Sequence, residues 1–541
     1  MEKIMDWIKS GDETTLEEYF ERRLGPLEDI DRDYDFNVPG IADFIEYIKT
    51  HGSDEYIVIG DYDTDGITAT AVMKIGLEQY FRLKGVNKNI SYRLPKRFSE
   101  GYGISAPVIE DIPGGSTVIT VDNGIAAIDE IKMLKQRGNK VLLTDHHLPV
   151  VIDKKIVLPP ADILIDPHVD DEGFEDYCGA GLAYKIMKRL LPEDDPVLPL
   201  LNAYAAIGTV SDVVPLIKEN RAIVKSGLEV LNGRRGILTR GLKALIAGLK
   251  LGEKEIESDD IAFYIAPALT AVSRLSDTGA QNALLTIIDN SRETAAKRAE
   301  ALISENERRK RAVEKAMKEA DGILKGKELR FPVMLKLSAG EGIIGLVASK
   351  LCDRYRAPAI VFTENEYASN ELKGSARSTK DCHIKELFDR HRELFMQYGG
   401  HAGAAGCTVK NEDFEKLKAE LTEDLKDYKP SGRVYDLELS PENAMGTIDE
   451  LKKYKPFGEG NREPVFHIKE KALYCSLMGQ DEEHIKFGFN GVDVVAFRQS
   501  ESIEPVKRKS GVTIDAFGRL SVNVFKDLSR AQMIADDIYA K

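Results

Sequence analysis

Apolar and polar residues begin to alternate in a regular way near Tyr56. Short runs rich in Val, Ile and Leu alternate there with segments that have helical spacing. Four of these runs are YIVIG (56–60), TVITV (117–121), KVLLT (140–144) and ADILI (161–165). Wholly apolar runs separated by helical segments are typical of βαβ units, whose strands form a parallel sheet. The pattern therefore predicts a parallel α/β domain.

Further patterns follow along the chain. Residues 200–245 and 283–325 have helical spacing. Within the second stretch, RETAAKRAEALISENERRKRAVEKAMKEADGIL (292–324) contains no Gly or Pro before Gly322, which predicts one long connecting helix. A second α/β segment covers about 329–428. After Gly432, short alternating runs such as VDVVAF and GVTIDAF predict a small β-barrel.

Acidic side chains follow each of the four apolar runs, and imidazole side chains follow two of them. In chain order they are Asp61, Asp63, Asp65, Asp122, Asp145, His146, His147, Asp166 and His168. Ligands of an open parallel sheet bind in the crevice beyond the carboxyl ends of its strands. Carboxylates gathered there repel one another unless a cation neutralises them, which predicts a metal site. Oxygen ligands with one or two imidazoles favour Mn²⁺ or Mg²⁺.

Each motif has a simpler interpretation when it is taken alone. DYDTDG (61–66) resembles the first half of a calcium-binding loop, although the closing Glu of such a loop is absent. A single Asp after a strand, such as Asp122 or Asp166, is more often a helix N-cap. The adjacent His146 and His147 are harder to explain by packing, because the chain has only nine histidines. Together the motifs favour a metal centre.

The composition is that of a globular protein with several domains. The chain has 541 residues, of which 43% are hydrophobic and 30% charged, and roughly 150 residues per domain would give two to four domains. No apolar run approaches the ~20 residues that span a bilayer, and the first residues do not resemble a secretory signal. Five widely spaced cysteines without a CxxC motif argue against disulfides or a zinc ribbon, so we expect a cytoplasmic protein.

The net charge of −15 does not by itself suit a partner with a phosphate backbone. The distribution of charge sets local attraction, however, and a metal site needs its own carboxylates. The basic clusters are Arg93, Lys96 and Arg97; Arg308 to Arg311; and Lys507 to Lys509. A solvated surface is the simpler interpretation of the last two clusters.

Several segments resemble known families. Four resemble, in order and spacing, the motifs of the DHH phosphoesterase superfamily, namely VIGDYDTDGITATAVM, VITVDNGI, LLTDHHLP and AAIGTVSDVVPL. The segments that resemble the DHHA1 subfamily are GYGIS (101–105), GEGIIGLVASKL (340–351), GSARS (374–378) and GGHAGAAG (399–406). KPFGEGNREPVF (455–466) with the β-rich tail is similar to the RecJ-type single-strand-specific exonucleases, in which an OB-fold follows.

This resemblance implies a fold class and a domain order. The expected fold is α/β, with a parallel-sheet DHH domain joined by a long helix to a smaller α/β DHHA1 domain and followed by an OB-like β-barrel. The expected boundaries are 1–50 for an N-terminal lead-in, 51–282 for the DHH catalytic domain, 283–325 for the connecting helix, 326–430 for the DHHA1 substrate-binding domain and 431–541 for the OB-fold nucleic-acid-binding domain.

The resemblance also implies roles at the metal centre. The expected ligands of two Mn²⁺ or Mg²⁺ ions are Asp61, Asp63, Asp65, Asp122, His146 and Asp212. His147 is expected at the scissile phosphate or the leaving oxygen, with a ligand or supporting role as the alternative. The implied catalytic set is therefore Asp65, His146 and His147. Two cations about 3.5–4 Å apart can activate water and stabilise both oxygens of an in-line displacement.

Further residues match substrate-binding positions of RecJ-like enzymes. Arg97, Ser375 and Arg377 match positions that bind the terminal 5′ phosphate, and guanidinium and hydroxyl groups suit phosphate oxygens. Tyr102 is expected to stack on, or block, the terminal nucleotide. The other expected substrate-binding residues are Arg274, Gly400 and His401.

The chain departs from the family pattern at two places. In PALTAVSR (267–274), Ala268 replaces an arginine, Thr270 an asparagine and Ser273 a glycine, while Arg274 is retained. These differences weaken the expectation of phosphate contacts there. Asp166 stands where asparagine is common, so it is not counted as a ligand.

The leading interpretation is a metal-dependent 5′→3′ exonuclease that releases 5′-mononucleotides from single-stranded DNA, in DNA repair or recombination. One alternative is a DHH phosphodiesterase for oligoribonucleotides or cyclic dinucleotides, which the C-terminal β domain disfavours. Another is a catalytically inactive DHH-fold scaffold of a replication complex, which the full set of motif acids disfavours. We expect single-stranded DNA as a partner, with a single-strand-binding protein or a helicase as further options, no membrane contact, and a monomer.

Overall fold

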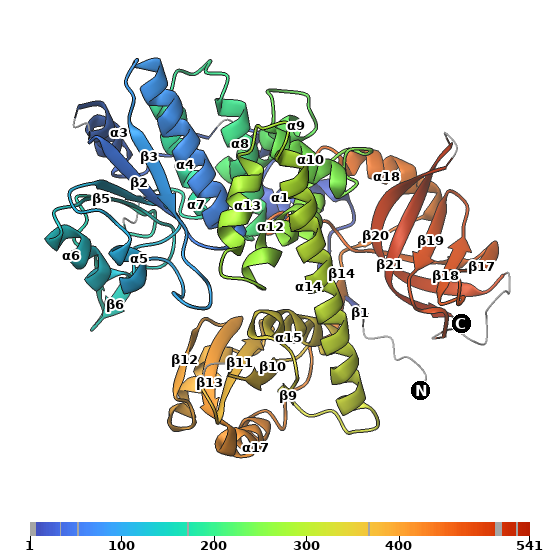
Figure 1. The fold of residues 1–541 in the computed structure, drawn as a ribbon. Helices are drawn as coiled ribbons and strands as arrows, with labels where there is room; N and C mark the ends of the chain where they lie inside the picture. The colour runs from blue at the N-terminus through green and yellow to red at the C-terminus, as the bar shows by residue number, and fades with distance from the viewer. Residues whose placement is uncertain are drawn as a thin grey trace. The chain divides into compact units, whose positions relative to one another are not determined.

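The structure is a computed structural model (Figure 1), and it describes residues 7–32, 34–50, 53–169, 173–365, 368–501, 503, 511–525 and 528–540. The chain forms two compact units. The larger unit comprises Met1–Leu269, Ala280–Ala299 and Gly432–Lys541, and the smaller unit comprises Thr270–Gly279 and Glu300–Ser431. The basic triplet Lys507 to Lys509 lies outside the described residues. Of the helices within the described ranges, none combines the length and the hydropathy that a membrane span requires.

The parallel α/β domain predicted from the apolar runs is confirmed. Its sheet has the order β3–β2–β4–β5–β8, and all neighbouring strands are parallel. The strands are β2 (Glu55–Ile59), β3 (Asn89–Arg93), β4 (Thr117–Thr120), β5 (Lys140–Thr144) and β8 (Ile163–Ile165). β4 is wholly buried and β2 and β5 nearly so, as expected of strands covered on both faces. The edge strand β3 is partly exposed, and its mixed sequence NISYR is not an apolar run.

Helices pack beside this sheet and place the polar strand ends. α4 (Thr64–Leu83) begins directly after β2 and packs against α7 (Gly179–Leu190) and α8 (Leu198–Ser211). Most residues of α4 are buried for that reason, and Figure 1 shows α4 beside these two helices. Further helices around this sheet include α3 (Ile41–Thr50), α5 (Ala106–Glu110), α6 (Ile128–Gln136), α9 (Lys218–Leu231), α10 (Arg240–Gly248), α11 (Ser258–Asp260) and α12 (Ala266–Ser273), with a π-helix at Ile261–Ile265.

The expected connecting helix has a different start. Two helices, α13 (Gly279–Ile287) and α14 (Ala295–Leu324), stand in place of a single helix over 283–325. Between them the Asp289 carboxylate accepts hydrogen bonds from the Ser291 backbone N–H at 2.7 Å and the Thr294 hydroxyl at 2.6 Å. Short polar side chains that bind local backbone groups compete with helix formation. The break therefore follows from a local polar sequence within an otherwise helical pattern.

The smaller unit is a second α/β fold. Its sheet has the order β12–β13–β11–β10–β9, in which β9 and β10 are parallel and the other pairs antiparallel. The strands are β9 (Val333–Lys336), β10 (Ala359–Glu364), β11 (Glu371–Arg377), β12 (Gln397–Gly400) and β13 (Ala404–Lys410), and the helices are α15 (Glu341–Tyr355), α16 (Ile384–Asp389) and α17 (Phe414–Asp424). Separate apolar cores lie on its two faces.

The predicted C-terminal β-barrel is confirmed as a mixed, seven-stranded sheet. Its order is β15–β16–β20–β21–β19–β18–β17. The strands are β15 (Leu437–Glu438), β16 (Phe466–Lys471), β17 (Tyr474–Met478), β18 (His484–Gly488), β19 (Val492–Ala496), β20 (Thr513–Phe525) and β21 (Leu528–Ala540). The helix α18 (Ala444–Leu451) packs on β20 and β21.

The N-terminal segment, expected only as a lead-in, contributes to the core of this barrel. β1 (Trp7–Lys9) pairs in parallel with β14 (Arg433–Tyr435). α1 (Leu16–Leu24) buries Leu16, Tyr19 and Phe20 among barrel side chains. The sequence contains no signal for this association, because the partner segments are more than 400 residues apart.

A buried arginine joins the barrel to the α/β domain within the larger unit. Arg221 on α9 is 1% exposed, and its guanidinium donates to the backbone carbonyl oxygens of Tyr454 at 2.8 Å and Lys455 at 2.6 Å. It also pairs with Asp31 at 3.1 Å. Buried carbonyl groups need donors, and here one side chain supplies them. The KPFG segment that the sequence singles out is thus a docking element.

Candidate metal centre

The first group of carboxylates lies where β2 ends and α4 begins. Asp61 is buried, and its Oδ1 accepts a hydrogen bond from the Gly103 backbone N–H at 3.1 Å. Its other oxygen, Oδ2, has no hydrogen-bond partner among the described residues. Asp63 is the N-cap of α4 and accepts from the Gly66 backbone N–H at 3.0 Å. One strand-to-helix turn therefore holds two carboxylates in fixed orientations.

Asp65 is held by the beginning of another helix. Its Oδ2 accepts from the Gly179 N–H at 2.6 Å and its Oδ1 from the Ala180 N–H at 3.0 Å, both in the first turn of α7. Free N–H groups and the helix dipole favour negative charge at this position. A side chain at Gly179 would approach the Asp122 Cβ to 2.5 Å. The absence of a side chain at Gly179 thus lets Asp122, at the end of β4, lie against the beginning of α7.

The second and third strand ends meet at His146. Asp122, directly after β4, has a positive φ of 61° and points its Oδ1 at the His146 Nε2, 3.0 Å away. The same nitrogen lies 3.7 Å from Asp65 Oδ2 and 3.7 Å from Asp212 Oδ2. Asp212 is the C-cap of α8. The structure therefore brings a residue far away in sequence into contact with the strand-end cluster.

The electrostatics of this cluster favour a cation. Burial, followed by the neighbouring carboxylates, raises the pKa of Asp61 and of Asp212 to about 8. The same causes raise the pKa values of Asp63 and Asp122 above the ordinary range, and burial lowers the pKa of His146. Without a cation, the buried carboxylates thus retain protons, which reduce the repulsion between their negative charges. Two sets of side chains in this cluster bring their ligand atoms within 4.8 Å of one another, namely Asp65, His146 and Asp212, and Asp122, His146 and His147.

His147 belongs to a second layer of the site. Its Nδ1 is 2.7 Å from Asp145 Oδ1, and its Nε2 is 3.1 Å from the Tyr102 hydroxyl. Burial lowers the pKa of His147, but the hydrogen bond and charge of Asp145 outweigh it and raise the pKa to about 9. The side chain is still 43% exposed. An exposed imidazolium beside buried carboxylates can donate to an incoming anion.

Tyr62, an aromatic residue that the sequence analysis did not select, connects Arg97 to Tyr102. The guanidinium carbon of Arg97 lies 4.9 Å from the centroid of the Tyr62 ring. The rings of Tyr62 and Tyr102 meet edge to face at 6.0 Å. Tyr62 stands between the ligand candidates Asp61 and Asp63, and that position is the signal that could have identified it.

The remaining expected substrate residues belong to the smaller unit. Ser375 and Arg377 alternate along β11, with the Arg377 guanidinium 3.3 Å from the Ser375 hydroxyl oxygen. Gly400 ends β12 with a φ of 141°, and the His401 Nδ1 accepts from the Gly403 N–H at 3.3 Å. Arg274 follows α12.

The positions that depart from the family pattern have local roles. Ala268 and Ser273 are buried on α12, and the Ser273 hydroxyl donates to the Thr270 carbonyl oxygen at 2.9 Å. Asp166 accepts from the His168 N–H at 2.9 Å, as residues in a turn do.

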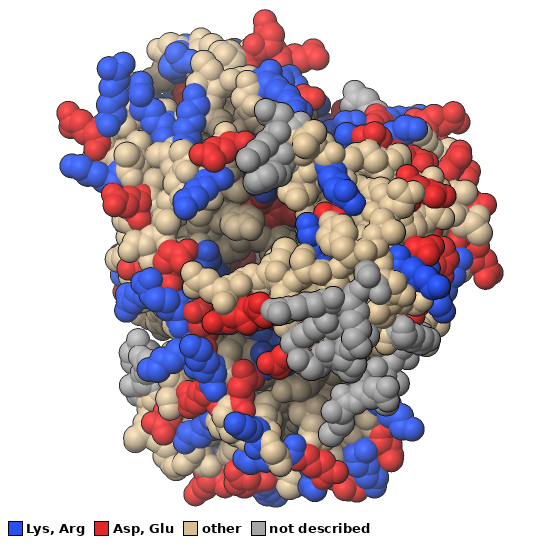
Figure 2. Space-filling view, turned by 90° about the vertical axis from the view of Figure 1, so that its right-hand side faces the viewer, with Lys and Arg blue, Asp and Glu red and all other residues tan. Residues whose placement is uncertain are grey.

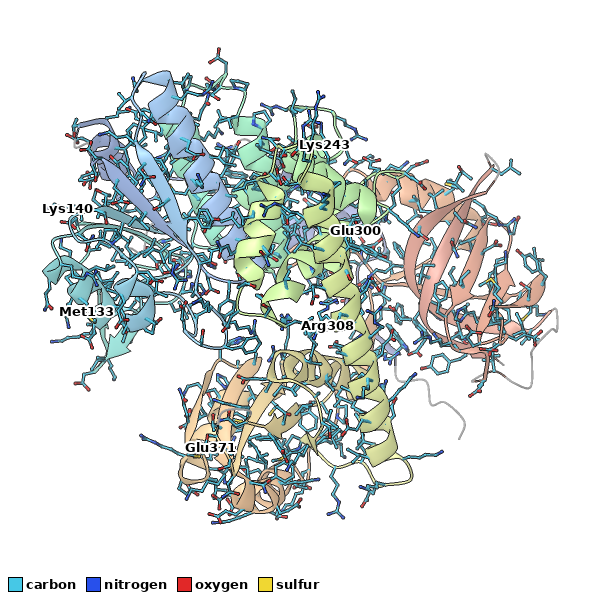
Figure 3. All side chains as sticks on the ribbon, in the orientation of Figure 1. Met133, Lys140, Lys243, Glu300, Arg308 and Glu371 are labelled. Atoms are coloured by element: carbon cyan, nitrogen blue, oxygen red, sulfur yellow. The ribbon has the colours of Figure 1, made fainter. Side chains whose placement is uncertain are left out.

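The basic clusters are partly neutralised. Arg93 pairs with Glu100 at 2.6 Å and with Asp111 at 2.9 Å. Arg308, labelled on α14 in Figure 3, pairs with Glu305 at 3.3 Å. On the face drawn in Figure 2, cationic and anionic side chains are interspersed rather than gathered into one basic patch. These contacts agree with a solvated surface for the cluster on α14.

The fold and the cluster together define a class of protein. Residues 55–209 match the model of the DHH family, N-terminal domain, residues 331–427 match the DHHA1 domain, and residues 435–537 match the RecJ OB domain. This is the domain order expected from the sequence motifs.

Comparison with whole proteins identifies the family within this class. The chain is 31% identical to the single-stranded-DNA-specific exonuclease RecJ of Haemophilus influenzae, over 88% of this chain and 83% of that protein. It is 32% identical to the Bacillus subtilis RecJ, over 93% of this chain and 64% of that protein. A crystal structure of Thermus thermophilus RecJ in complex with Mn²⁺ matches with a TM-score of 0.79 and 26% identity, over 96% of this chain and 75% of that one. The chain belongs to the RecJ family of single-stranded-DNA-specific exonucleases.

Proposed function

We propose that this protein is a metal-dependent 5′→3′ exonuclease that removes 5′-mononucleotides from single-stranded DNA. The observation that carries the proposal is the cluster of acids and imidazoles at the strand ends, in a chain of the RecJ family. DNA repair or recombination is the process that we infer for it.

The proposed cofactors are two Mn²⁺ or Mg²⁺ ions. Relatives from Thermus thermophilus were crystallised with each of these ions. The donor set of this chain fits them, because buried carboxylate oxygens of Asp61 and Asp122 have no hydrogen-bond partner among the described residues. The proposed ligands are Asp61, Asp63, Asp65, Asp122, His146 and Asp212. When bound, the cations supply an activated water and neutralise the charge of an in-line displacement at phosphorus.

We propose that His147, oriented by Asp145, contacts the scissile phosphate. Asp145 holds the His147 imidazole by its Nδ1, and the resulting pKa of about 9 keeps that ring protonated at neutral pH. The Nε2–H can then donate to a phosphate oxygen or to the leaving 3′ oxygen. In the structure the Tyr102 hydroxyl is hydrogen-bonded to this Nε2. When the substrate binds, this hydrogen bond would break and the Tyr102 side chain would turn toward the terminal nucleotide.

Two separate groups of side chains are proposed to bind the end of the strand. Arg97 on the larger unit, and Ser375 with Arg377 on the smaller unit, provide donors for a 5′ phosphate. Gly400 and His401 are proposed to contact the backbone beyond it, and Arg274 is a further phosphate contact. Guanidinium and hydroxyl donors suit phosphate oxygens, which supports these assignments.

The domain roles, the partners and the location belong to the same proposal. The ranges 51–282, 283–325, 326–430 and 431–541 are proposed as the catalytic, connecting, substrate-binding and strand-binding parts, with 1–50 as the lead-in. We infer a cytoplasmic monomer; the five free cysteine thiols support a reducing compartment. A single-strand-binding protein or a helicase is the proposed protein partner, and sedimentation and co-purification test both inferences.

The function is tested with matched oligonucleotides. Strands of DNA and of RNA, single and duplex, with a 5′ phosphate or a 5′ hydroxyl, are incubated with the full chain and Mn²⁺, Mg²⁺ or EDTA. The proposal expects mononucleotides from the 5′ end of single-stranded DNA, only with a cation. Release from the 3′ end, or equal cleavage in EDTA, would contradict it.

A further inference from the structure

The outer face of the C-terminal barrel carries a row of polar side chains. β17, β18, β19 and β21 are neighbours in the sheet. On these strands Ile485, Phe487, Val494 and Met533 belong to the apolar core. Side chains alternate between the two faces of a strand, so the neighbouring positions face outward. The outward residues of interest are Tyr474, Lys486, Gly488, Asp493 and Arg530.

Tyr474 lies across the adjacent strand. It stands directly opposite Gly488 in the pairing of β17 with β18, and Gly488 stands opposite Asp493 on β19. A Cβ atom at Gly488 would be 1.9 Å from the Tyr474 Cε1. The Tyr474 hydroxyl donates to Asp493 Oδ1 at 2.8 Å. The glycine therefore provides the space for the ring, and the carboxylate holds its far end, while 38% of the side chain stays exposed.

Two cations flank this ring. The Lys486 Nζ is 3.2 Å from Asp493 Oδ2, and the Arg530 Nε is 3.0 Å from Asp493 Oδ1. The Lys486 ammonium also lies 5.7 Å from the centroid of the Tyr474 ring. One carboxylate thus orients two cations and leaves a local excess of positive charge. In the basic cluster on α14, by contrast, Arg308 and Lys310 each pair with a separate glutamate, Glu305 and Glu307.

We propose that Tyr474 is a stacking platform for a base of single-stranded DNA, with Lys486 and Arg530 binding the phosphates beside it. This inference rests on the proposed function, that the chain acts on single-stranded DNA. Proteins that hold single strands combine aromatic rings for the bases with a cationic path for the backbone. Both components are present here on adjacent strands of one sheet face.

Phe517, another aromatic residue of the barrel, is excluded from this role by its position. It is 1% exposed and stacks on Trp7 at 4.6 Å and on His467 at 4.3 Å, so it belongs to the joint with the N-terminal strand. Phe497 is 51% exposed and packs edge to face on His484. It lies beyond the end of β19 and outside the row, which makes it a matched control.

A purely structural role of Tyr474 makes a different prediction. An aromatic ring over a cross-strand glycine also stabilises a sheet. In that case Tyr474→Ala lowers the thermal stability but leaves DNA affinity unchanged. A stacking role predicts a loss of affinity in a protein that is still folded. Binding and unfolding measured on the same variants separate the two roles.

The experiment measures binding of the full chain to fluorescein-labelled oligothymidylate in EDTA, which prevents metal-dependent cleavage. Tyr474→Ala is expected to weaken binding of a long strand at least about fivefold, the lower end of what one stacked base contributes. Tyr474→Phe retains the ring and is expected to lose less. Gly488→Ala removes no group from the site, but its methyl displaces the ring, so it should behave like Tyr474→Ala. Phe497→Ala should bind like the unaltered protein.

The cations are tested through salt dependence. Lys486→Gln and Arg530→Gln should each lower the log–log slope of affinity against salt by about 0.7, the value for one phosphate of a single strand. Ultraviolet crosslinking of the unaltered protein to bromodeoxyuridine-containing DNA should label the peptide that contains Tyr474. This second measurement decides the question even if a variant does not fold.

The outcomes distinguish this inference from the proposed function. Unchanged affinity of folded Tyr474→Ala, or crosslinks confined to other peptides, would overturn the platform while cleavage by the unaltered protein persists. Absence of any cleavage of DNA by the unaltered protein would overturn the proposed function instead. A preference of the row for oligosaccharides over DNA, which some OB-folds show, would also overturn the platform.

Discussion

The strand-end cluster of the α/β domain and the outer face of the barrel are two polar surfaces with opposite construction. The cluster is buried, acidic and held by backbone N–H groups, as Asp65 is at the start of α7. The barrel face is exposed and cationic, and it is organised by a single carboxylate, Asp493. Burial strengthens the electrostatic interactions of the carboxylates with a cation, whereas exposure lets the cationic side chains contact the phosphates of a long strand. The net charge of −15 is therefore no obstacle to a nucleic-acid substrate.

The largest expected effect separates chemistry from strand binding. Asp122→Ala removes a central carboxylate of the cluster, and turnover should fall by at least ~10³-fold, because cation-assisted activation of water is worth several kcal/mol. Binding of long strands in EDTA should change little. Single-turnover cleavage with Mn²⁺ and fluorescence binding measure the two quantities.

Asp166→Asn provides the control for this variant. Asp166 is also a buried aspartate after a parallel strand, but its Oδ1 accepts from the His168 backbone. It should retain most of the activity. Full activity of Asp122→Ala, or an equal loss with Asp166→Asn, would show that the cluster is not the reacting centre.

The second-largest expected effect concerns Arg221, which joins the α/β domain to the barrel. Arg221→Ala leaves buried carbonyl groups of the Tyr454–Lys455 segment without their donor, so the free energy of unfolding should fall by about 3 kcal/mol. Lys225→Ala, one turn further along α9, removes only a half-exposed partner of Asp31 and should cost less than about 1 kcal/mol. Urea denaturation compares the variants, and equal losses would refute the docking role of Arg221.

The packing of α1 in the barrel core makes removal of the barrel a poor test of strand binding. A chain that ends near Tyr428 loses the barrel and uncovers Leu16, Tyr19 and Phe20 of α1. Such a chain is expected to aggregate, because these side chains form part of the barrel core. Point variants are therefore the better way to separate strand binding from chemistry.

A third effect tests whether the smaller unit adds another cationic contact. Arg377→Ala should reduce the preference for a 5′-phosphorylated strand over a 5′-hydroxyl strand by roughly tenfold or more, since a charge-assisted hydrogen bond contributes ~1.5–3 kcal/mol. Lys373→Ala, on the same face of β11, is the matched control and should retain the preference. An equal loss of rate on both strands would assign Arg377 a different role.

The sequence is sufficient to predict the strands and helices that carry the cluster. Buried parallel strands are apolar along their whole length, and the polar residue at each end is then conspicuous, as Asp122 and His146 are. Asp212 required the family resemblance, because the end of a helix has no such pattern. Tyr62 and Asp145 were not selected, since each stands beside a residue with a more obvious role.

The barrel face could not be predicted in the same way. Its residues alternate with core residues on short strands, so periodicity identifies the barrel but does not show which polar side chains meet. The contact between Tyr474 and Asp493 depends on the register of three strands and on Gly488 between them. The contribution of α1 to the core likewise depends on tertiary packing. Long-range pairing, rather than local sequence, determines these features.

The smallest expected effect is the pH dependence of the acidic cluster. Asp61 and Asp212 have their pKa raised from 3.8 to about 8 by burial and by neighbouring carboxylates. The metal-free folded protein therefore holds protons that the unfolded chain has lost over this range. It follows that the free energy of unfolding in EDTA falls as the pH rises from about 4 to 8. Thermal unfolding at several pH values measures this slope.

Cation binding should reverse that trend, because the ligands must lose their protons to bind a metal. Raising the pH from 7 to 8 should therefore strengthen Mn²⁺ binding several-fold, and binding at pH 7 should release protons, which calorimetry in buffers of different ionisation enthalpy detects. Asp61→Asn removes one of the titrating ligands and should release fewer protons. DNA binding by the barrel face in EDTA should vary little over this range, because that face does not include the titrating carboxylates of the cluster. Mn²⁺ affinity that is independent of pH would mean that these carboxylates are already ionised in the metal-free protein, and the contrast between the two surfaces would then rest on geometry alone.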